Sequence, residues 1–235
     1  MRDQWINERC CHNFRYINGK IKAVVISFHG LNARYRDENT PLEFALAESN
    51  ILVIAPYYGP WSWMNRQARA FVDELLDHVF AELGDENIPL IASGGSMGGC
   101  AALLFCRYSK HRPVACDAVW PVCDTVAHFS ERPDLPPTFH QAFLGYAEPM
   151  EELLKEHSPL HQIEALPRIP YLFTHGLNDV RVNKAIHSDR MVSALIERGH
   201  QVEYAEVSGC GHGVSVPLSV TLRRLEFIRR FAEDR

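Results

Sequence analysis

The chain has 235 residues, of which 46% are apolar and 23% are charged, and its formal net charge is -5. This length and composition exclude a disordered or collagen-like chain and are typical of one α/β-sized globular domain, whose core needs no disulfide or structural metal. The mild acidic excess and the lack of a dense basic run argue against nucleic acid as a partner.

No segment of the sequence predicts a membrane span or a secretory signal. The longest nearly apolar stretch, residues 97–106, is too short to cross a bilayer and is interrupted by glycines. The first 20 residues carry charges throughout and lack an apolar segment. Seven cysteines without a CxxC pair suit reduced, buried thiols. We therefore expect a cytoplasmic protein with no membrane partner.

Six short runs of β-branched and other apolar residues recur along the chain, with segments of helical periodicity between them. They cover residues 23–28, 51–55, 88–92, 115–122, 171–174 and 201–207. Such uninterrupted apolar runs are typical of buried parallel strands. The sequence therefore predicts the α/β class, with a mostly parallel sheet and helices on both faces.

The clearest helix signal lies between the second and third runs, where apolar residues follow the i, i+3, i+4, i+7 pattern from Ala68 to Leu83 and stop at Gly84. Further helices are predicted over residues 97–108, 183–198 and 217–231. Residues 124–159, rich in His, Pro and aromatic residues, follow the fourth run without such a pattern. We interpret residues 1–235 as a single domain with residues 124–159 as a small cap-like insertion.

A Gly-x-Ser-x-Gly motif follows the third run, where residues 94–99 read GGSMGG before the chain becomes helical. At a sharp strand-to-helix turn, glycines are needed because side chains would collide, and the serine is exposed at the tip. A phosphate-binding turn is the alternative, but the dinucleotide and Walker spacings are absent. The motif predicts Ser96 as a nucleophile.

A serine hydroxyl needs a base to remove its proton, so the motif predicts a histidine and an acid further along the chain. Asp179 follows the fifth run and His212 follows the sixth. Because the carboxyl ends of parallel strands share one edge, these side chains should converge on Ser96, with His212 Nε2 toward Ser96 and Nδ1–H toward Asp179. Asp124, at the end of the fourth run, is the alternative acid, and its other interpretation is a helix cap for the insertion.

The negatively charged oxygen of the reaction intermediate needs two N–H donors. One is expected from Met97, directly after the nucleophile. The other is expected from the loop after the first run, where Leu31 is the candidate and Gly30 the alternative.

Four aromatic residues, Tyr57, Tyr58, Trp61 and Trp63, follow the second run within seven positions. Their density on a loop at the same sheet edge predicts a wall that binds substrate. The alternative is a small satellite core under the loop. The His157–His161 pair encloses Pro159, which disfavours one helical metal face. We expect no metal or organic cofactor.

With these motifs the sequence resembles the α/β-hydrolase superfamily, and within it the prolyl oligopeptidase and dienelactone hydrolase group. The motifs that carry the resemblance are His29-Gly30, Ser96-Met97-Gly98-Gly99, Ser158-Pro159, His175-Gly176, Asp179-x-Arg181-Val182 and Gly209-x-Gly211-His212-Gly213. The resemblance implies the α/β-hydrolase fold, a catalytic triad of Ser96, Asp179 and His212, and an oxyanion hole formed by Leu31 and Met97.

Two departures from this group narrow the expected activity. Its peptidases carry a large N-terminal gating domain, whereas about 20 residues precede the first predicted strand here, and its dienelactone hydrolases use cysteine where this chain has Ser96. What remains resembles the compact esterases. We therefore expect a serine hydrolase that cleaves carboxylic esters through an acyl-enzyme, and the aromatic loop suggests aromatic or sugar-linked acyl esters.

Two other activities stay open at this point. One is a small serine peptidase, aminopeptidase-like or amidase activity, with Arg34, Asp37 and Glu38 as possible anchors for a charged substrate end. The other is a catalytically silent hydrolase fold used for binding. The expected partner is a small-molecule ester or a short peptide, and a homodimer is plausible from general frequency alone.

Overall fold

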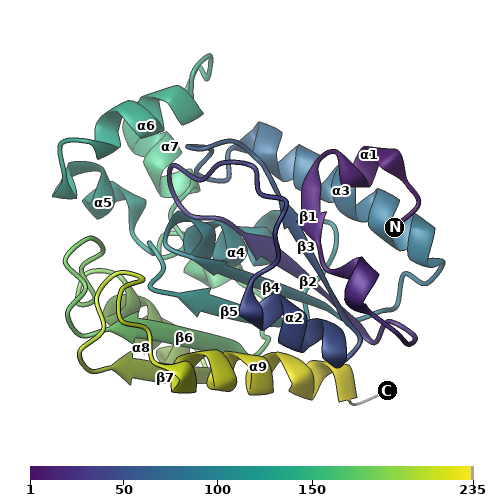
Figure 1. The fold of residues 1–235 in the computed structure, drawn as a ribbon. Helices are drawn as coiled ribbons and strands as arrows, with labels where there is room; N and C mark the ends of the chain where they lie inside the picture. The colour runs from purple at the N-terminus through teal and green to yellow at the C-terminus, as the bar shows by residue number, and fades with distance from the viewer. Residues whose placement is uncertain (234–235) are drawn as a thin grey trace.

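The computed structural model describes residues 1–233. Within these residues the chain forms a seven-stranded sheet with the order β1-β3-β2-β4-β5-β6-β7 (Figure 1). The strands are β1 (Cys10–His12), β2 (Ala23–Phe28), β3 (Ile51–Pro56), β4 (Leu90–Gly95), β5 (Ala115–Val119), β6 (Tyr171–Gly176) and β7 (Val202–Val207). The strands β2 to β7 pair in parallel. This confirms the predicted α/β-hydrolase fold.

The sequence does not predict β1, which pairs antiparallel with β3 at one edge of the sheet. Cys10 lies opposite Pro56, and His12 lies opposite Ile54. A three-residue strand shows neither alternation nor a long apolar run. Its extended conformation depends on pairing with β3, which local sequence does not reveal.

Helices cover both faces of the sheet (Figure 1). The helices α3 (Arg66–Leu83), α4 (Met97–Tyr108) and α8 (Ser188–Glu197) pack on one face, and α2 (Pro41–Glu48) and α9 (Leu218–Glu233) pack on the other. Side chains of β2 alternate between the two layers: Val24 and Ile26 join the cluster with α3 and α4, and Val25 joins the cluster with α2 and α9. A core on each side of the sheet fixes the strand ends that carry the site.

The helix α3 lies where its periodicity predicts. The Asn65 side chain accepts the Ala68 N–H at its start, and Gly84 ends the helix with a φ of 67°, a conformation that glycine adopts without a Cβ penalty. The bounds of α4 agree with the prediction, and α9 begins one residue after the predicted Pro217.

The predicted helix over residues 183–198 begins only at Ser188. The preceding residues form turns in which the Asn183 carbonyl accepts the N–H groups of Ile186 and His187. His187 has φ -101° and ψ -84°, outside the helical region, so the regular helix starts after it.

The helix α2 is absent from the prediction, although its start carries a recognisable signal. The Thr40 side chain accepts the Glu43 N–H, the Glu43 side chain accepts the Thr40 N–H, and Pro41 is the first helical residue. This capping box with proline at the first position marks a helix start in the sequence itself.

Residues 124–159 form three short helices beside the carboxyl ends of the strands, at the upper left of Figure 1. They are α5 (Thr125–Glu131), α6 (Leu135–Ala142) and α7 (Met150–Glu156). Their buried side chains Leu135, Phe139 and Leu153 belong to the same cluster as those of α3 and α4. The insertion therefore packs as an extension of that core.

The remaining helical segments are short: α1 (Gln4–Asn7) and two 3-10 turns, Phe14–Tyr16 and Ile163–Ala165. Along residues 1–233, no helix combines the length and hydrophobicity needed to cross a membrane. The seven cysteines are all buried free thiols.

Candidate active site

Ser96 occupies the sharp turn between β4 and α4. Its backbone has φ 61° and ψ -125°, a sparsely populated conformation that costs about 1–3 kcal/mol. Glycines make the turn possible, because a Cβ on Gly94 would lie 2.2 Å from Gly98 O and a Cβ on Gly98 would lie 2.2 Å from Phe28 O. The structure therefore has the strand-turn-helix geometry that the motif predicts.

His212 lies between Ser96 and Asp179. Its Nε2 is 2.9 Å from Ser96 Oγ, and its Nδ1 is 2.7 Å from Asp179 Oδ2. Asp179 comes from the loop after β6 and His212 from the loop after β7, so all three side chains meet where strands end at one edge of the sheet. The structure thus brings the three residues into one hydrogen-bonded chain.

The Asp179 carboxylate is held through both oxygens. Oδ1 accepts the N–H groups of Arg181 (2.9 Å) and Val182 (3.0 Å), and Oδ2 accepts the N–H of His212. Burial alone would raise the pKa of Asp179, but His175, His212 and the Val182 N–H together lower it well below its usual range. The carboxylate therefore stays ionised.

In this hydrogen-bonded series, the Asp179 side chain is shielded from solvent, whereas Ser96 and His212 are partly exposed. The Asp179 side chain is 0% exposed, the His212 side chain is 16% exposed, and Ser96 is half-buried. Because Asp179 accepts the Nδ1 proton, a neutral His212 presents an unprotonated Nε2 to the Ser96 hydroxyl. This arrangement can remove the hydroxyl proton.

Of the two predicted oxyanion donors, Met97 directly follows Ser96, and Leu31 follows a glycine that is close to Ser96. Met97 is the first residue of α4, where helical N–H groups have no partner inside the helix. Leu31 follows Gly30, and a Cβ on Gly30 would lie 3.7 Å from Ser96 Cβ. Within residues 1–233 neither the Leu31 nor the Met97 N–H donates a backbone hydrogen bond outside regular structure. Both are available to a substrate oxygen.

A sequence comparison bears on the same residues. Residues 74–235, which include Ser96, Asp179 and His212, match the prolyl oligopeptidase family. The chain belongs to this family. Membership supports an enzyme of the serine hydrolase type and confirms the resemblance found in the motifs. No curated protein sequence matches the chain significantly.

Solved structures with a similar fold include peptidases and esterases. A puromycin-hydrolyzing peptidase of Mycobacterium tuberculosis is 20% identical (TM-score 0.70), the acylaminoacyl peptidase of Pyrococcus horikoshii 16% (0.74), and esterase PE8 19% (0.63). Each alignment covers 92% of this chain, but 35%, 38% and 95% of the respective other chain. This chain thus spans about a third of the length of the two peptidases. The likeness shows a shared fold.

Asp124, the alternative acid, caps the first helix of the insertion and contacts an arginine of α8. Its Oδ1 accepts the Ala127 N–H at 3.0 Å and caps α5, and its Oδ2 lies 2.7 Å from Arg190 Nη1. These contacts are those of the capping interpretation. The carboxylate that contacts His212 is Asp179.

The aromatic loop after β3 divides between core and surface. Tyr58 is 7% exposed and Trp63 is 1% exposed. The Tyr58 hydroxyl donates to His29 O (2.8 Å), and Trp63 stacks on Phe139 while its Nε1–H donates to Thr138 Oγ1 (3.0 Å). These contacts correct the predicted four-residue wall, because protein already encloses both rings. For Tyr58 and Trp63 the core interpretation holds.

Tyr57 and Trp61 remain accessible. Trp61 is 37% exposed, and its Nε1–H donates to Asn32 Oδ1 in the loop after β2. Tyr57 lines a cavity of about 420 Å³ together with His29 and Arg34, and it also lines a second cavity of about 460 Å³. The part of the predicted wall that a ligand can reach therefore lies at Tyr57 and Trp61.

Trp120 is a residue of the site that the sequence analysis missed. It follows β5 with a φ of 36°, and its ring centroid lies 6.1 Å from that of His212. A Cβ on Gly95 would lie 3.3 Å from its Nε1. The sequence signal for Trp120 is its place directly after a strand and before Pro121. The predicted strand over residues 115–122 runs past Trp120, so the residue was assigned to that strand.

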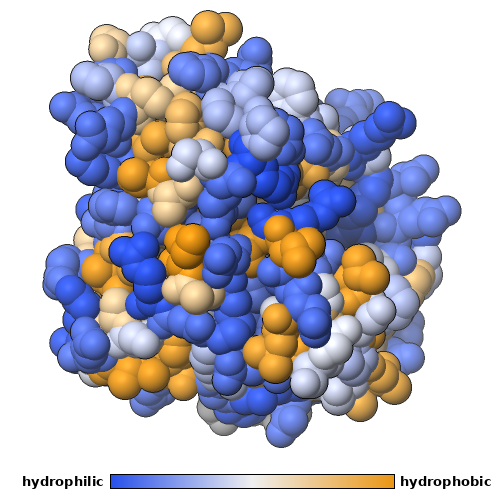
Figure 2. All heavy atoms as spheres, turned by 90° about the vertical axis from the view of Figure 1, so that its left-hand side faces the viewer, coloured by the Kyte–Doolittle hydropathy of each residue, from blue (hydrophilic) through white to orange (hydrophobic). Residues whose placement is uncertain are grey.

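Figure 2 shows the side of the molecule toward which the carboxyl ends of the parallel strands point. Apolar side chains form small separate patches among hydrophilic ones on this face. Leu177 and Val180 are exposed beside Asp179, and Val214 is exposed beside His212. The loops that carry Asp179 and His212 therefore present exposed apolar side chains.

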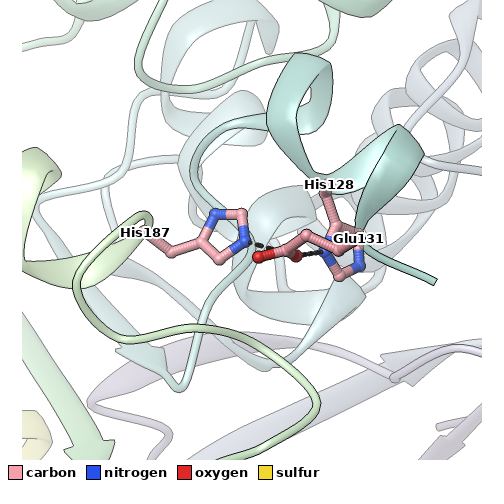
Figure 3. A group of neighbouring side chains, drawn as sticks. All are labelled: His128, Glu131 and His187. Carbon is pink, nitrogen blue, oxygen red and sulfur yellow. Dashed lines mark hydrogen bonds and ion pairs between the residues drawn. The ribbon is translucent and has the colours of Figure 1, made fainter.

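His128, Glu131 and His187 form the one His/Cys/Asp/Glu cluster with metal-ligand spacing in the described chain (Figure 3). Glu131 Oε2 accepts hydrogen bonds from His128 Nδ1 and from His187 Nε2, the latter at 3.0 Å. His187 Nδ1 accepts the N–H groups of Cys123 and Asp124, both at 3.2 Å. A neutral His187 therefore carries its proton on Nε2.

The position of the His187 proton decides whether these three residues can bind a metal ion. A histidine that binds a metal through one nitrogen normally keeps its proton on the other, whereas both donors at His187 Nδ1 require that nitrogen to be bare. A metal at Nε2 would have to displace the only ring proton. The donor set fits a hydrogen-bonded clasp between α5 and the residue before α8, and we call these three residues the His–Glu–His clasp.

Proposed function

We propose that this protein is a serine hydrolase that cleaves small carboxylic esters through an acyl-enzyme. The observation that carries the proposal is the chain from Ser96 Oγ to His212 Nε2 (2.9 Å) and from His212 Nδ1 to Asp179 Oδ2 (2.7 Å). Ser96 is half-buried rather than enclosed. A base in contact with a reachable serine hydroxyl is the arrangement that activates it for acyl transfer.

In the first half of the reaction, Ser96 Oγ attacks the ester carbonyl carbon while His212 Nε2 takes the hydroxyl proton. The N–H groups of Leu31 and Met97 stabilise the oxyanion of the tetrahedral intermediate. Asp179 stays ionised and stabilises the imidazolium. His212 then gives the proton to the leaving alcohol, and the acyl group remains on Ser96.

In the second half, His212 removes a proton from water as the water attacks the acyl-enzyme. The same two N–H groups hold the second oxyanion. Collapse of this intermediate releases the carboxylic acid and returns the proton to Ser96. Every step uses side chains and backbone groups of the chain itself.

Two observations support esters as the substrate class. The solved structures with a similar fold include esterase PE8. Tyr57 and Trp61 provide accessible aromatic surface near the loop that carries Leu31. We expect this surface to favour an aromatic acyl or alcohol group, including hydroxycinnamoyl esters.

The test compares wild type, Ser96→Ala and Ser219→Ala, an exposed serine on α9, on aryl esters with acetyl, butyryl, octanoyl and hydroxycinnamoyl groups. We expect Ser96→Ala to lose at least about 10³-fold in kcat/KM and to lose labelling by a fluorophosphonate probe. Ser219→Ala should match wild type. Ester turnover that survives Ser96→Ala would contradict the proposal.

Aminopeptidase-like or amidase activity is the second candidate. Arg34 lines the 420 Å³ cavity, which Ser96 and His212 do not line, and no salt bridge joins it to an acid in residues 1–233. It could therefore bind the carboxylate of a substrate that extends from Ser96 to this cavity. Faster cleavage of aminoacyl anilides than of matched aryl esters would favour this activity. Arg34→Ala should then raise KM for the charged substrate, with kcat little changed.

A further inference from the structure

A second histidine lies against Asp179, near the same carboxylate oxygen that His212 contacts. His175, in β6, is 0% exposed. Its Nε2 lies 3.1 Å from Val182 O and 3.3 Å from Asp179 Oδ2, and its Nδ1 lies 2.7 Å from Ser188 Oγ. Because a carbonyl oxygen only accepts, Nε2 carries a proton, and Nδ1 of the neutral ring accepts the Ser188 hydroxyl proton.

His175 Nε2 donates its proton to Val182 O, and Asp179 Oδ2 lies 3.3 Å from the same nitrogen. Asp179 Oδ2 thus accepts the His212 N–H at 2.7 Å and has the His175 N–H beside it as an electrostatic contact. The shorter bond is the stronger one, and the longer contact shares the same oxygen. The partial positive charge of the neutral His175 N–H reduces the negative charge that Oδ2 offers to His212.

His175 also joins a loop to the sheet. Asp179 lies in a loop whose residues Leu177, Val180 and Arg181 are exposed, whereas β6 is buried between β5 and β7. A carboxylate on such a loop needs an anchor in the rigid sheet if its orientation is to be constant. His175 supplies that anchor through a side chain that is itself held by Ser188.

We propose that His175 is a positioning residue, which holds the Asp179 carboxylate against His212 and sets how strongly Asp179 stabilises the protonated ring. Ser188 fixes the tautomer of His175 that this role requires. The inference rests on the proposed function, since the position of Asp179 matters to catalysis only if Ser96 and His212 react.

Other charged or titratable groups surround this pair. Arg132 at the end of α5 and Cys210 in the loop after β7 interact with Asp179, and Asp189 in α8 interacts with His175. His212 faces Asp179 from the loop after β7. These groups are the same in wild type and in His175 variants, so a change in pH dependence between the two reports on His175.

The sign of the expected change follows from the charge on Asp179. Without the His175 N–H, Oδ2 keeps more negative charge, while the N–H groups of Arg181 and Val182 still hold the carboxylate against His212. The protonated form of His212 is then stabilised more strongly. Protonated His212 cannot accept the Ser96 proton. The acidic limb of the kcat/KM profile should therefore move to higher pH.

The experiment measures kcat, KM and the pH profile with p-nitrophenyl acetate for wild type, His175→Phe, His175→Gln and Ser188→Ala. Phenylalanine keeps the ring volume but lacks the N–H, and we expect kcat to fall about tenfold with KM unchanged and the acidic limb displaced by about 0.5 pH unit. In His175→Gln the side-chain amide can donate to Asp179, so the acidic limb should lie close to its wild-type pH. Ser188→Ala should give a smaller displacement in the same direction.

His157→Phe is the matched control, because His157 is also 0% exposed and its ring hydrogen-bonds, among residues 1–233, to the Leu153 carbonyl alone through Nδ1. It should lower stability and leave the limb unchanged. Fluorophosphonate titration corrects each rate for the fraction of competent sites. An acidic limb in His175→Phe that coincides with wild type would overturn the proposal.

A readout without substrate separates this inference from the proposed function. The N–H proton shared by His212 and Asp179 should give a far-downfield NMR signal, whose pH dependence reports protonation of His212 in Ser96→Ala as well as in wild type. If wild type hydrolyses no ester but His175→Phe moves this titration upward, the proposed function fails and the contact stands. If wild type is active and the titration does not move, the positioning role fails.

Discussion

At the scale of single residues, the two aspartates in the loops after β5 and β6 have different partners. We expect Asp179 to act in catalysis and Asp124 to stabilise the fold. Asp179 contacts His212, and Asp124 caps α5 and pairs with Arg190. Asp179→Asn removes the charge that stabilises the imidazolium and favours the wrong His212 tautomer, so we expect kcat to fall about 10⁴-fold. Steady-state rates on an aryl ester measure this loss.

Asp124→Asn is the comparison. An asparagine still caps a helix but loses the charge facing Arg190, so we expect a loss of about 0.5–1.5 kcal/mol in the free energy of unfolding and a kcat within a few-fold of wild type. Urea unfolding measures the first quantity. A larger loss of kcat in Asp124→Asn than in Asp179→Asn would reverse the assignment of the acid.

Sequence reasoning located Ser96, Asp179 and His212 because acyl transfer restricts residue type and because parallel strands end at a common edge. It could not separate Tyr57 and Trp61 from their buried neighbours. Trp63 is buried because Phe139 of α6 stacks on its ring, and that contact joins segments 76 positions apart. Burial of this kind depends on tertiary packing, which local composition does not contain.

At the scale of elements, the His–Glu–His clasp joins the insertion to α8. Burial alone would raise the pKa of Glu131, but the hydrogen bonds from His128 and His187 lower it from 4.5 to about 2. A carboxylate with a lowered pKa stabilises the fold above its ordinary pKa, and this contribution disappears as the pH falls through the lowered value. The window therefore runs from pH 4.5 down to about 2.

Glu131→Gln should reduce the free energy of unfolding by about 1.5–3 kcal/mol near neutral pH, because charged hydrogen bonds are lost. The difference from wild type should shrink as the pH is lowered through that window. Denaturant unfolding of both proteins across the pH range measures it. The control is Glu164→Gln, an exposed ion pair with Arg198, for which we expect less than about 1 kcal/mol. A pH-independent difference for Glu131→Gln would contradict the linkage.

The elements that sequence predicted well are those with their own local signals. The helix α3 has a full apolar periodicity and the stop at Gly84, and the buried strands are continuous apolar runs. The edge strand β1 and the turns over residues 183–187 depend on partners elsewhere in the fold. The helix α2 is different, because its capping box at Thr40 was readable and was missed.

At the scale of the whole molecule, packing protects the thiols. All seven cysteines are buried, and burial raises the pKa of Cys10 to about 12 and also raises those of Cys116 and Cys123. The thiolate is the reactive form. We expect the native protein at pH 8 to react with a disulfide reagent at least about 100-fold more slowly than the unfolded chain, because reaction requires opening of the structure.

Absorbance of the released thiol product measures this reaction, with the urea-unfolded protein as the reference for seven reactive groups. Rapid stoichiometric labelling of any thiol in the native protein would contradict uniform protection. Since Cys210 lies two residues from His212, slow labelling there also means that thiol reagents should leave ester turnover intact.

Glycine would suit position 96 better than serine in one respect, because φ 61° and ψ -125° are accessible to a residue without Cβ. We expect Ser96→Gly to unfold with a free energy about 1 kcal/mol higher than Ser96→Ala, measured by thermal and urea unfolding. A free energy of unfolding for Ser96→Ala that exceeds that of Ser96→Gly by about 0.4–1 kcal/mol, the entropic gain of alanine at an unstrained position, would show that the turn is unstrained.

Selection for a durable fold alone would therefore favour glycine over serine at this turn. In a lineage that no longer needs the reaction, position 96 should drift toward glycine while the surrounding core persists, since the substitution both abolishes turnover and relieves the backbone. We therefore expect serine to persist at this turn only where its hydroxyl is needed for the proposed reaction.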